Sequence, residues 1–262
     1  ARTLGSLQKA PLVTAVPASD KPHLVLVHGT FVDTESTFGK LWQKQPGQVR
    51  RLFDRYASVL ALDHATLGRS PTHNALTLAR SLPQGARLHL LTHSRGGLVA
   101  EVLVRVAARP RSEPGELDAF APDDRADLEE LARLVVDRDL AVTRVVRVAC
   151  PARGTLLASG RLDAYLSVFR WTLQLAGLPV APQILKLLQA IVAEKSNAEV
   201  LPGLAAMNPE SALVQWLHPA DLETPSELRV VAGDADGSSA TSWIKTLLAD
   251  AFFWTDNDLV VQ

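Results

Sequence analysis

The sequence predicts an α/β fold built on a doubly wound, mostly parallel sheet. Short apolar segments alternate along the chain with segments of helical periodicity. The apolar segments are nearly continuous, which is typical of parallel strands covered by helices on both faces. With 262 residues, 47% of them hydrophobic, the chain is long enough for one large core, or for a core with a cap.

The expected elements follow in chain order. Residues 1–21 are expected to be a linker or the tail of an upstream region, and residues 22–262 to form the domain. Strands are expected at 23–29, 57–64, 87–93, 143–150 and 227–234, and helices within 65–83, 96–109 and 125–138. The segment 109–124 is rich in Pro, Gly and acidic residues and is expected to be a surface excursion.

A mostly helical block is expected at 156–218. Ile184, Leu187, Leu188 and Ile191 lie at helical spacing within it. Two interpretations stay open: the apolar stripe packs into an ordinary core, or the block is a cap whose apolar face lines a binding cleft.

A candidate site lies at one edge of the predicted sheet. Gly29, Ser94, Pro151 and Gly233 each follow directly on a predicted strand. In an open, doubly wound sheet, ligands bind at the carboxyl ends of the strands. These residues are therefore expected to meet at the same rim.

The stretch "RLHLLTHSRGGLVAEVL" (87–103) predicts that Ser94 is a nucleophile. A sharp turn from strand to serine to helix projects the hydroxyl into a cleft, but it requires small residues two positions before and after the serine. These are Thr92, where Gly is usual, and Gly96. The start of the next helix would favour a developing oxyanion. The alternative is that Ser94 only N-caps that helix.

The stretch "VHGTF" (27–31) supports the catalytic interpretation. Backbone N–H groups of Thr30 and Arg95 are expected to form an oxyanion hole beside Ser94. The side chains of Arg95 and Arg153 are expected at the rim of the cleft. There they would either hold a substrate carboxylate or phosphate, or be solvated charges.

Several motifs together resemble the α/β-hydrolase fold on its lipase/esterase side, over about residues 23–262. They are "LVLVHGTF", "LTHSRGGLVAEVL", "ACPARGT", "LPGLAAMNPESALVQWL" and "DNDLVV". The closest likeness is to the lipase-like domain of large multidomain bacterial proteins, some of which carry a CHAT domain. The resemblance implies the triad order serine, acid, histidine, with Asp258 as the acid and Asp236 as its alternative.

No histidine follows Asp258 in this sequence. The domain is therefore expected to be C-terminally incomplete, with its catalytic histidine downstream and flanking domains covalently linked to it; His218 is the alternative base. The expected function is a serine hydrolase acting on carboxylic esters, lipid esters included, through an acyl-enzyme. The alternatives are an inactive binding or scaffold module that kept the fold, and an acyl transferase.

Composition argues against other classes of function. A net charge of −1, from 27 basic and 28 acidic residues, gives no positive field for nucleic acid. No apolar run is clean enough to span a bilayer, and no metal or cofactor motif is present, so none is expected. The single cysteine, Cys150, is expected to be a buried thiol at a strand end, and it suits a cytoplasmic protein.

Overall fold

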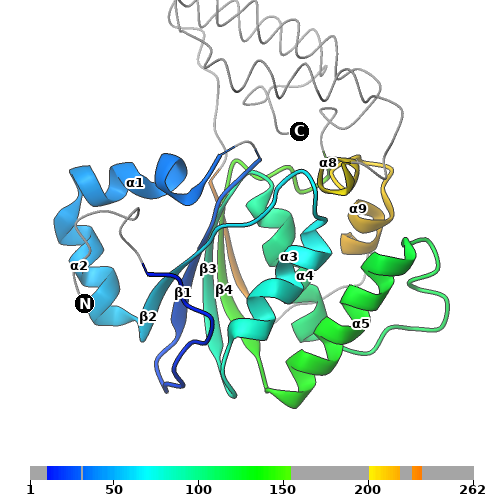
Figure 1. Cartoon of the computed structure of the whole chain (residues 1–262), viewed down its shortest axis with the longest axis horizontal. Helices are drawn as coiled ribbons and strands as arrows, with labels where there is room; N and C mark the ends of the chain where they lie inside the picture. The colour runs from blue at the N-terminus through cyan, green and yellow to red at the C-terminus, as the bar shows by residue number, and fades with distance from the viewer. Residues whose placement is uncertain (1–10, 31, 155–200, 219–225, 232–262) are drawn as a thin grey trace, which may run out of the picture.

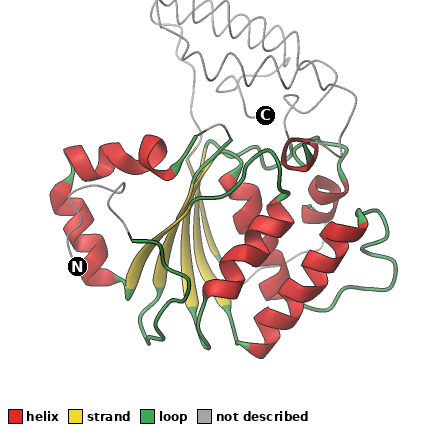
Figure 2. Cartoon of the chain, viewed as in Figure 1, coloured by secondary structure: helices red, strands yellow, loops and turns green. Residues whose placement is uncertain are grey.

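The computed structural model describes residues 11–30, 32–154, 201–218 and 226–231. Their core is a five-stranded sheet in the order β2-β1-β3-β4-β5, with every neighbouring pair parallel. The strands are β1 (His23–Val27), β2 (Ser58–Leu62), β3 (Arg87–His93), β4 (Ala141–Val148) and β5 (Glu227–Val231). Helices flank the sheet on both sides (Figures 1 and 2). The predicted α/β class with a mostly parallel sheet is confirmed.

One face carries α1 (Thr34–Lys44) and α2 (Pro46–Arg55). Leu24 and Leu26 of β1 pack against Trp42 and Val49 of these helices in a small hydrophobic cluster. Asp33 caps α1 by accepting a hydrogen bond from the Ser36 backbone N–H, at 2.8 Å. These two helices were not predicted from the sequence.

The other face carries the larger core. It is covered by α3 (Pro71–Ser81), α4 (Gly96–Ala108) and α5 (Pro122–Asp137), as Figure 1 shows. α4 is the central helix here, and Leu98, Val99 and Val102 in it are fully buried. α5 begins three residues before the expected 125, because Pro122 is favourable in the first turn of a helix.

The segment 109–124 is more than a surface excursion, which corrects the expectation. Phe120 is buried, and Glu116 accepts hydrogen bonds from Arg105 Nη2 of α4, at 2.6 Å, and from Trp216 Nε1, at 3.0 Å. The Arg105 guanidinium also lies 4.3 Å from the centre of the Trp216 ring. This cluster fixes the excursion to α4 and to α9 (Ala212–Leu217).

The described end of the 156–218 block packs as core. Leu213 and Leu217 of α9 belong to the same hydrophobic cluster as α4, and so does Leu204 of the short α8 (Pro202–Ala205). Residues 155–200, the rest of the expected cap, lie outside the described residues. None of the helices that the structure describes is long and apolar enough to cross a membrane.

The strand β5 was expected to be buried on both faces, and it is not. Within the described residues, Leu228, Val230 and Val231 are about half exposed or more. The near-continuous apolar pattern predicted two covered faces. β1 meets that expectation, since all five of its residues are buried.

Candidate active site

Ser94 is the first residue of a two-residue turn, Ser94 and Arg95, between β3 and α4. Its φ of 51° is in the left-handed region, which costs a residue other than Gly about 1 kcal/mol. Its N–H donates to the Val148 carbonyl and its carbonyl accepts from the Gly97 N–H, both at 2.9 Å. The N-cap of α4 is Arg95, without a side-chain capping bond, so the N-cap interpretation of Ser94 is wrong.

The residues two positions to either side of Ser94 explain how the chain fits this turn. A Cβ added to Gly96 would lie 2.5 Å from the Val27 carbonyl oxygen, so only glycine lets β1 approach here. Thr92 is fully buried, and its hydroxyl donates to the Val146 carbonyl at 3.3 Å. The threonine at the usual glycine position is therefore accommodated, with its polar group satisfied.

The loop after β1 lies directly against the serine. A Cβ added to Gly29 would lie 2.7 Å from Cβ of Ser94 and 3.2 Å from the His93 carbonyl oxygen. Thr30 follows, and its hydroxyl donates to Sδ of Met207 at 3.6 Å, which connects this loop to the segment after α8. The structure thus brings the "HGT" loop against the turn at Ser94 between β3 and α4, called the elbow below.

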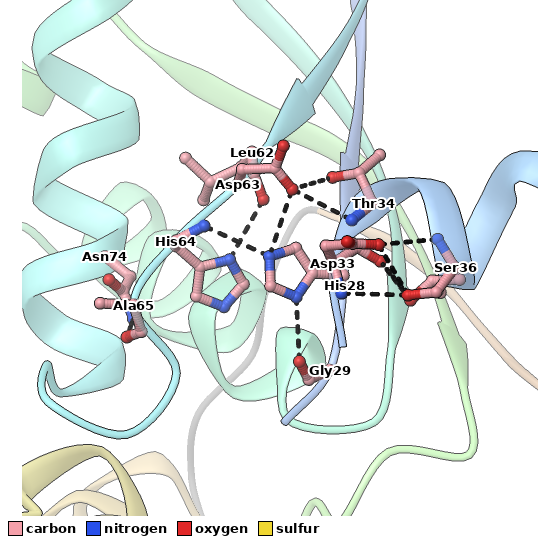
Figure 3. Close-up of polar contacts among 11 residues, drawn as sticks. His28, Gly29, Asp33, Thr34, Ser36, Leu62, Asp63, His64, Ala65 and Asn74 are labelled. Atoms are coloured by element: carbon pink, nitrogen blue, oxygen red, sulfur yellow. Dashed lines mark hydrogen bonds and ion pairs between the residues drawn. The ribbon is translucent and has the colours of Figure 1, made fainter. Parts of the chain in front are cut away.

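His28, at the start of this loop, lies beside His64, which follows β2 (Figure 3). His28 is buried, and its ring stacks on that of His64, with the centroids 4.2 Å apart. His28 Nδ1 is 2.9 Å from the Gly29 carbonyl oxygen, and His28 Nε2 is 3.2 Å from the His64 backbone N–H. Burial lowers the pKa of His64 to about 3, and the nearby His28 contributes to the shift.

The side chain of Arg95 is fully buried, against the expectation of a rim charge or a substrate clamp. Its Nη2 donates to the Arg69 carbonyl at 2.6 Å and its Nε to the Gly203 carbonyl at 3.3 Å. No carboxylate in the described part of the chain pairs with it, and burial lowers its pKa to about 9. The cation therefore connects the elbow to the loop before α3 and to α8. Arg153, in contrast, is exposed.

The turn after β4 forms the neighbouring part of the rim. A Cβ added to Gly97 would collide with Sγ of Cys150, so the thiol fills the space that this glycine leaves. Burial of the thiol raises the pKa of Cys150 to about 12, but the residue as a whole is only partly buried, so the expectation of a buried thiol is met in part. His218 Nε2 contacts the carbonyl oxygen of Ala152 in the same turn.

The strand order brings most of the predicted rim together. β3 lies between β1 and β4, so Gly29, Ser94 and Pro151 follow the carboxyl ends of three adjacent strands. Asp236, Asp258 and Gly233 lie outside the described residues. Within the described ranges, no group of three His, Cys, Asp or Glu side chains could hold a metal ion.

The family described as "Domain of unknown function (DUF7379)" matches residues 5–119 and 125–262. No curated protein matches the chain. Among solved structures, the chain is similar to the mature lipase BlEst2 of Bacillus licheniformis, with 14% identity, a TM-score of 0.47, and coverage of 97% of this chain and 81% of that one.

Two further solved structures are similar at the level of the fold. The Staphylococcus hyicus lipase has 15% identity and a TM-score of 0.47, with coverage of 95% of this chain and 81% of that one. The metagenomic carboxyl esterase MGS0156 has 19% identity and a TM-score of 0.45, with coverage of 97% of this chain and 62% of that one, so the chain spans less than two thirds of its length. These matches give no support to the likeness with CHAT-bearing proteins.

Proposed function

Because the chain belongs to the family described as "Domain of unknown function (DUF7379)", we propose its activity from the site itself: a serine hydrolase that cleaves carboxylic esters through an acyl-enzyme. The observation that carries the proposal is the backbone of Ser94. A φ of 51° at a serine between a parallel strand and a helix is strained, and strained residues cluster at functional sites. The loop at Gly29, which packs against this serine, forms the neighbouring side of the proposed site.

The mechanism begins with attack of Ser94 Oγ on the ester carbonyl carbon, while a histidine base takes the hydroxyl proton. Backbone N–H groups of Thr30 and Arg95 stabilise the oxyanion. The oxyanion collapses, the alkoxide leaves with the proton from the imidazolium, and water then releases the acyl group by the same steps. Asp258 orients the base, with Asp236 as the alternative acid. The base in this proposal is the histidine expected to follow Asp258, with His218 as the alternative.

The proposed substrates are carboxylic esters, from small acyl esters to lipid esters. The buried Arg95 guanidinium is bonded to backbone carbonyls, so it is not available to clamp an anionic substrate. Arg153 is exposed and remains the candidate for that role.

The test is to label the full-length protein with a fluorophosphonate and to assay it with p-nitrophenyl acetate, butyrate and octanoate. Ser94→Ala removes the nucleophile, and Ser19→Ala, at an exposed position, is the matched control. We expect labelling and turnover in the wild type and in Ser19→Ala, and neither in Ser94→Ala. Equal turnover in Ser94→Ala would falsify the proposal.

Two other outcomes identify the alternatives. If the wild type is neither labelled nor active, the hydrolase proposal is replaced by an inactive binding or scaffold module. If an added alcohol captures the acyl group faster than water does, the activity is that of an acyl transferase with the same acyl-enzyme. Assaying residues 1–262 beside the full-length protein also tests the base: activity of the short chain favours His218.

A further inference from the structure

The two contacts of the His28 ring determine where its proton lies. The His64 backbone N–H can only donate, so His28 Nε2, 3.2 Å away, accepts and carries no proton. The Gly29 carbonyl oxygen can only accept, so His28 Nδ1, 2.9 Å away, carries the proton and donates it. Both contacts require the same neutral tautomer of His28.

The bond to Gly29 fixes the direction of the next peptide group. The Gly29–Thr30 peptide is planar and trans, so its C=O and its N–H point in opposite directions. With the carbonyl held by His28, the Thr30 N–H points away from the imidazole. Glycine gives this peptide little resistance to rotation on its own. The hydrogen bond from His28 is therefore a direct constraint on its direction, beside the packing of Gly29 against Ser94 and the bond from Thr30 to Met207.

The imidazole of His28 is itself held on several sides. Its ring stacks on His64, whose Nδ1 lies 3.1 Å from the Leu62 carbonyl oxygen. The Asp63 carboxylate lies 3.5 Å from His28 Nε2. That carboxylate accepts from the Thr34 hydroxyl at 2.6 Å and from the Thr34 N–H at 3.0 Å, at the start of α1 (Figure 3). The His64 ring and the His64 backbone N–H, just after β2, therefore hold the His28 ring, whereas the Asp63 carboxylate is held by Thr34 and makes no hydrogen bond to the unprotonated Nε2.

We infer that His28 is a positioning residue, which aims the Thr30 N–H at the oxyanion formed at Ser94 by holding the Gly29 carbonyl. The inference rests on the proposed function and adds a side chain that acts through the backbone. A donor that is aimed before the reaction stabilises developing charge without reorganising, and the loss of one such donor typically lowers kcat by about 10²- to 10³-fold.

Two substitutions separate the roles of the two ring nitrogens. The amide nitrogen of the side chain introduced in His28→Asn can take the place of Nδ1 and still donate to Gly29. The longer side chain in His28→Gln places its amide near the Nε2 position, where it can accept from His64 but leaves Gly29 without its donor. His73→Gln is the control, because His73 is a histidine bonded to Asp127 at 2.9 Å on the α3–α5 side of the sheet.

We expect His28→Asn to keep kcat within about threefold of the wild type, and His28→Gln to lose about 10- to 100-fold in kcat with KM nearly unchanged. His73→Gln is expected to match the wild type. A purely structural His28 would give equal kcat in both variants, or a better kcat in His28→Gln, and either result overturns the inference.

Crystal structures of the two variants give a readout that is independent of activity. In His28→Asn the Gly29 carbonyl is expected to accept from the introduced side-chain amide, and in His28→Gln it is expected to turn away. An unchanged carbonyl direction in His28→Gln overturns the inference. If the wild type shows no reaction at Ser94, the proposed function fails, while the carbonyl direction still decides whether His28 orients this peptide.

Discussion

Gly29 and Ser94 touch so closely that no side chain fits between them: a Cβ on Gly29 would lie 2.7 Å from the Cβ of Ser94. The contact joins the loop after β1 to the elbow after β3, two segments that are 65 positions apart in the sequence. It places the Thr30 peptide next to the proposed nucleophile, and it makes the position of this loop sensitive to a single methyl group.

Gly29→Ala is expected to lower the rate of fluorophosphonate labelling of Ser94 by about 100-fold. The added methyl group forces the loop and the serine apart, and a displacement of about 1 Å in an active site costs about 10²-fold in rate. Labelling rates of the two proteins measure this. Gly68→Ala is the control, because no atom lies within 4 Å of a Cβ added there. An equal loss in both variants would refute a specific role of the contact.

Ser94→Gly is expected to stabilise the fold while abolishing the reaction. Glycine adopts a φ of 51° without the steric cost that serine has, so the free energy of unfolding should rise by about 0.5–1 kcal/mol, and Tm by about 1–4 °C. Differential scanning calorimetry of Ser94→Gly against Ser94→Ala separates the effect of φ from the loss of the hydroxyl. A lower Tm for the glycine variant would contradict strain at this position.

Arg95→Met is expected to destabilise the protein by about 2–4 kcal/mol. The substitution leaves the Arg69 and Gly203 carbonyls without their donors, and buried polar groups without partners are costly. Urea denaturation measures the change. Removing a buried cation also brings a gain in stability that offsets part of this loss. Arg95→Lys keeps the charge but cannot reach both carbonyls, so it is the informative control. It should be at least as unstable as Arg95→Met.

Stability is expected to fall as the pH drops below 6.5. Burial lowers the pKa of His64 from 6.5 to about 3, so between these values the unfolded chain binds a proton that the folded chain does not. The stabilisation is complete above pH 6.5 and is lost as the pH falls towards 3, by up to about 1.4 kcal/mol per pH unit. Burial also lowers the pKa of His23 and His89, which adds in the same direction.

His64→Phe tests the source of this pH dependence. Phenylalanine can stack on His28 but does not titrate, so the Tm of this variant should vary less between about pH 6.5 and 4.5 than that of the wild type. Parallel profiles of Tm against pH for the two proteins would show that His64 does not contribute.

Cys150 is expected to resist alkylation by iodoacetamide in the native protein at about pH 8. A pKa of about 12 instead of 9.0 lowers the thiolate fraction by about 1000-fold, and the thiolate is the reactive form. Mass spectrometry of native and urea-unfolded samples measures the difference. Comparable modification of both samples would show that the thiol is accessible and ionised.

The sequence predicted β1 well because a parallel strand buried on both faces carries a continuous apolar pattern, and β3 well because its buried residues alternate with partly buried ones. It did not predict α1 and α2, although both are amphipathic and have 11 and 10 residues, against 11 in the predicted α3. The capping residue Asp33 and Pro46 in the first turn of α2 were start signals that went unused. The elbow was predictable because its geometry demands small residues at fixed positions around Ser94.

The side chain of Arg95 and the histidine pair could not be predicted in the same way. An arginine next to a catalytic turn is by default a surface charge, and its burial depends on carbonyls 26 and 108 positions away. The tautomer of His28 depends on the His64 backbone, 36 positions away. Such contacts have no local sequence signal. The "HG" dipeptide, followed by "DH" at the end of the next strand, was the only available indication of the histidine pair.

The buried guanidinium of Arg95 also limits how this domain can be recombined with a relative. Gly203 receives its hydrogen bond, and the Gly203 N–H donates to the Leu67 carbonyl at 2.8 Å. Every parent supplies these backbone carbonyls, but their positions depend on close packing, because a Cβ at position 203 would lie 2.2 Å from the Thr66 carbonyl oxygen. A chimera that takes the elbow from one parent and α8 from the other can therefore place the acceptors out of reach of the Arg95 cation. Crossover points that keep residues 66–69, Arg95 and Gly203 from the same parent should therefore give folded progeny more often than crossovers that separate them.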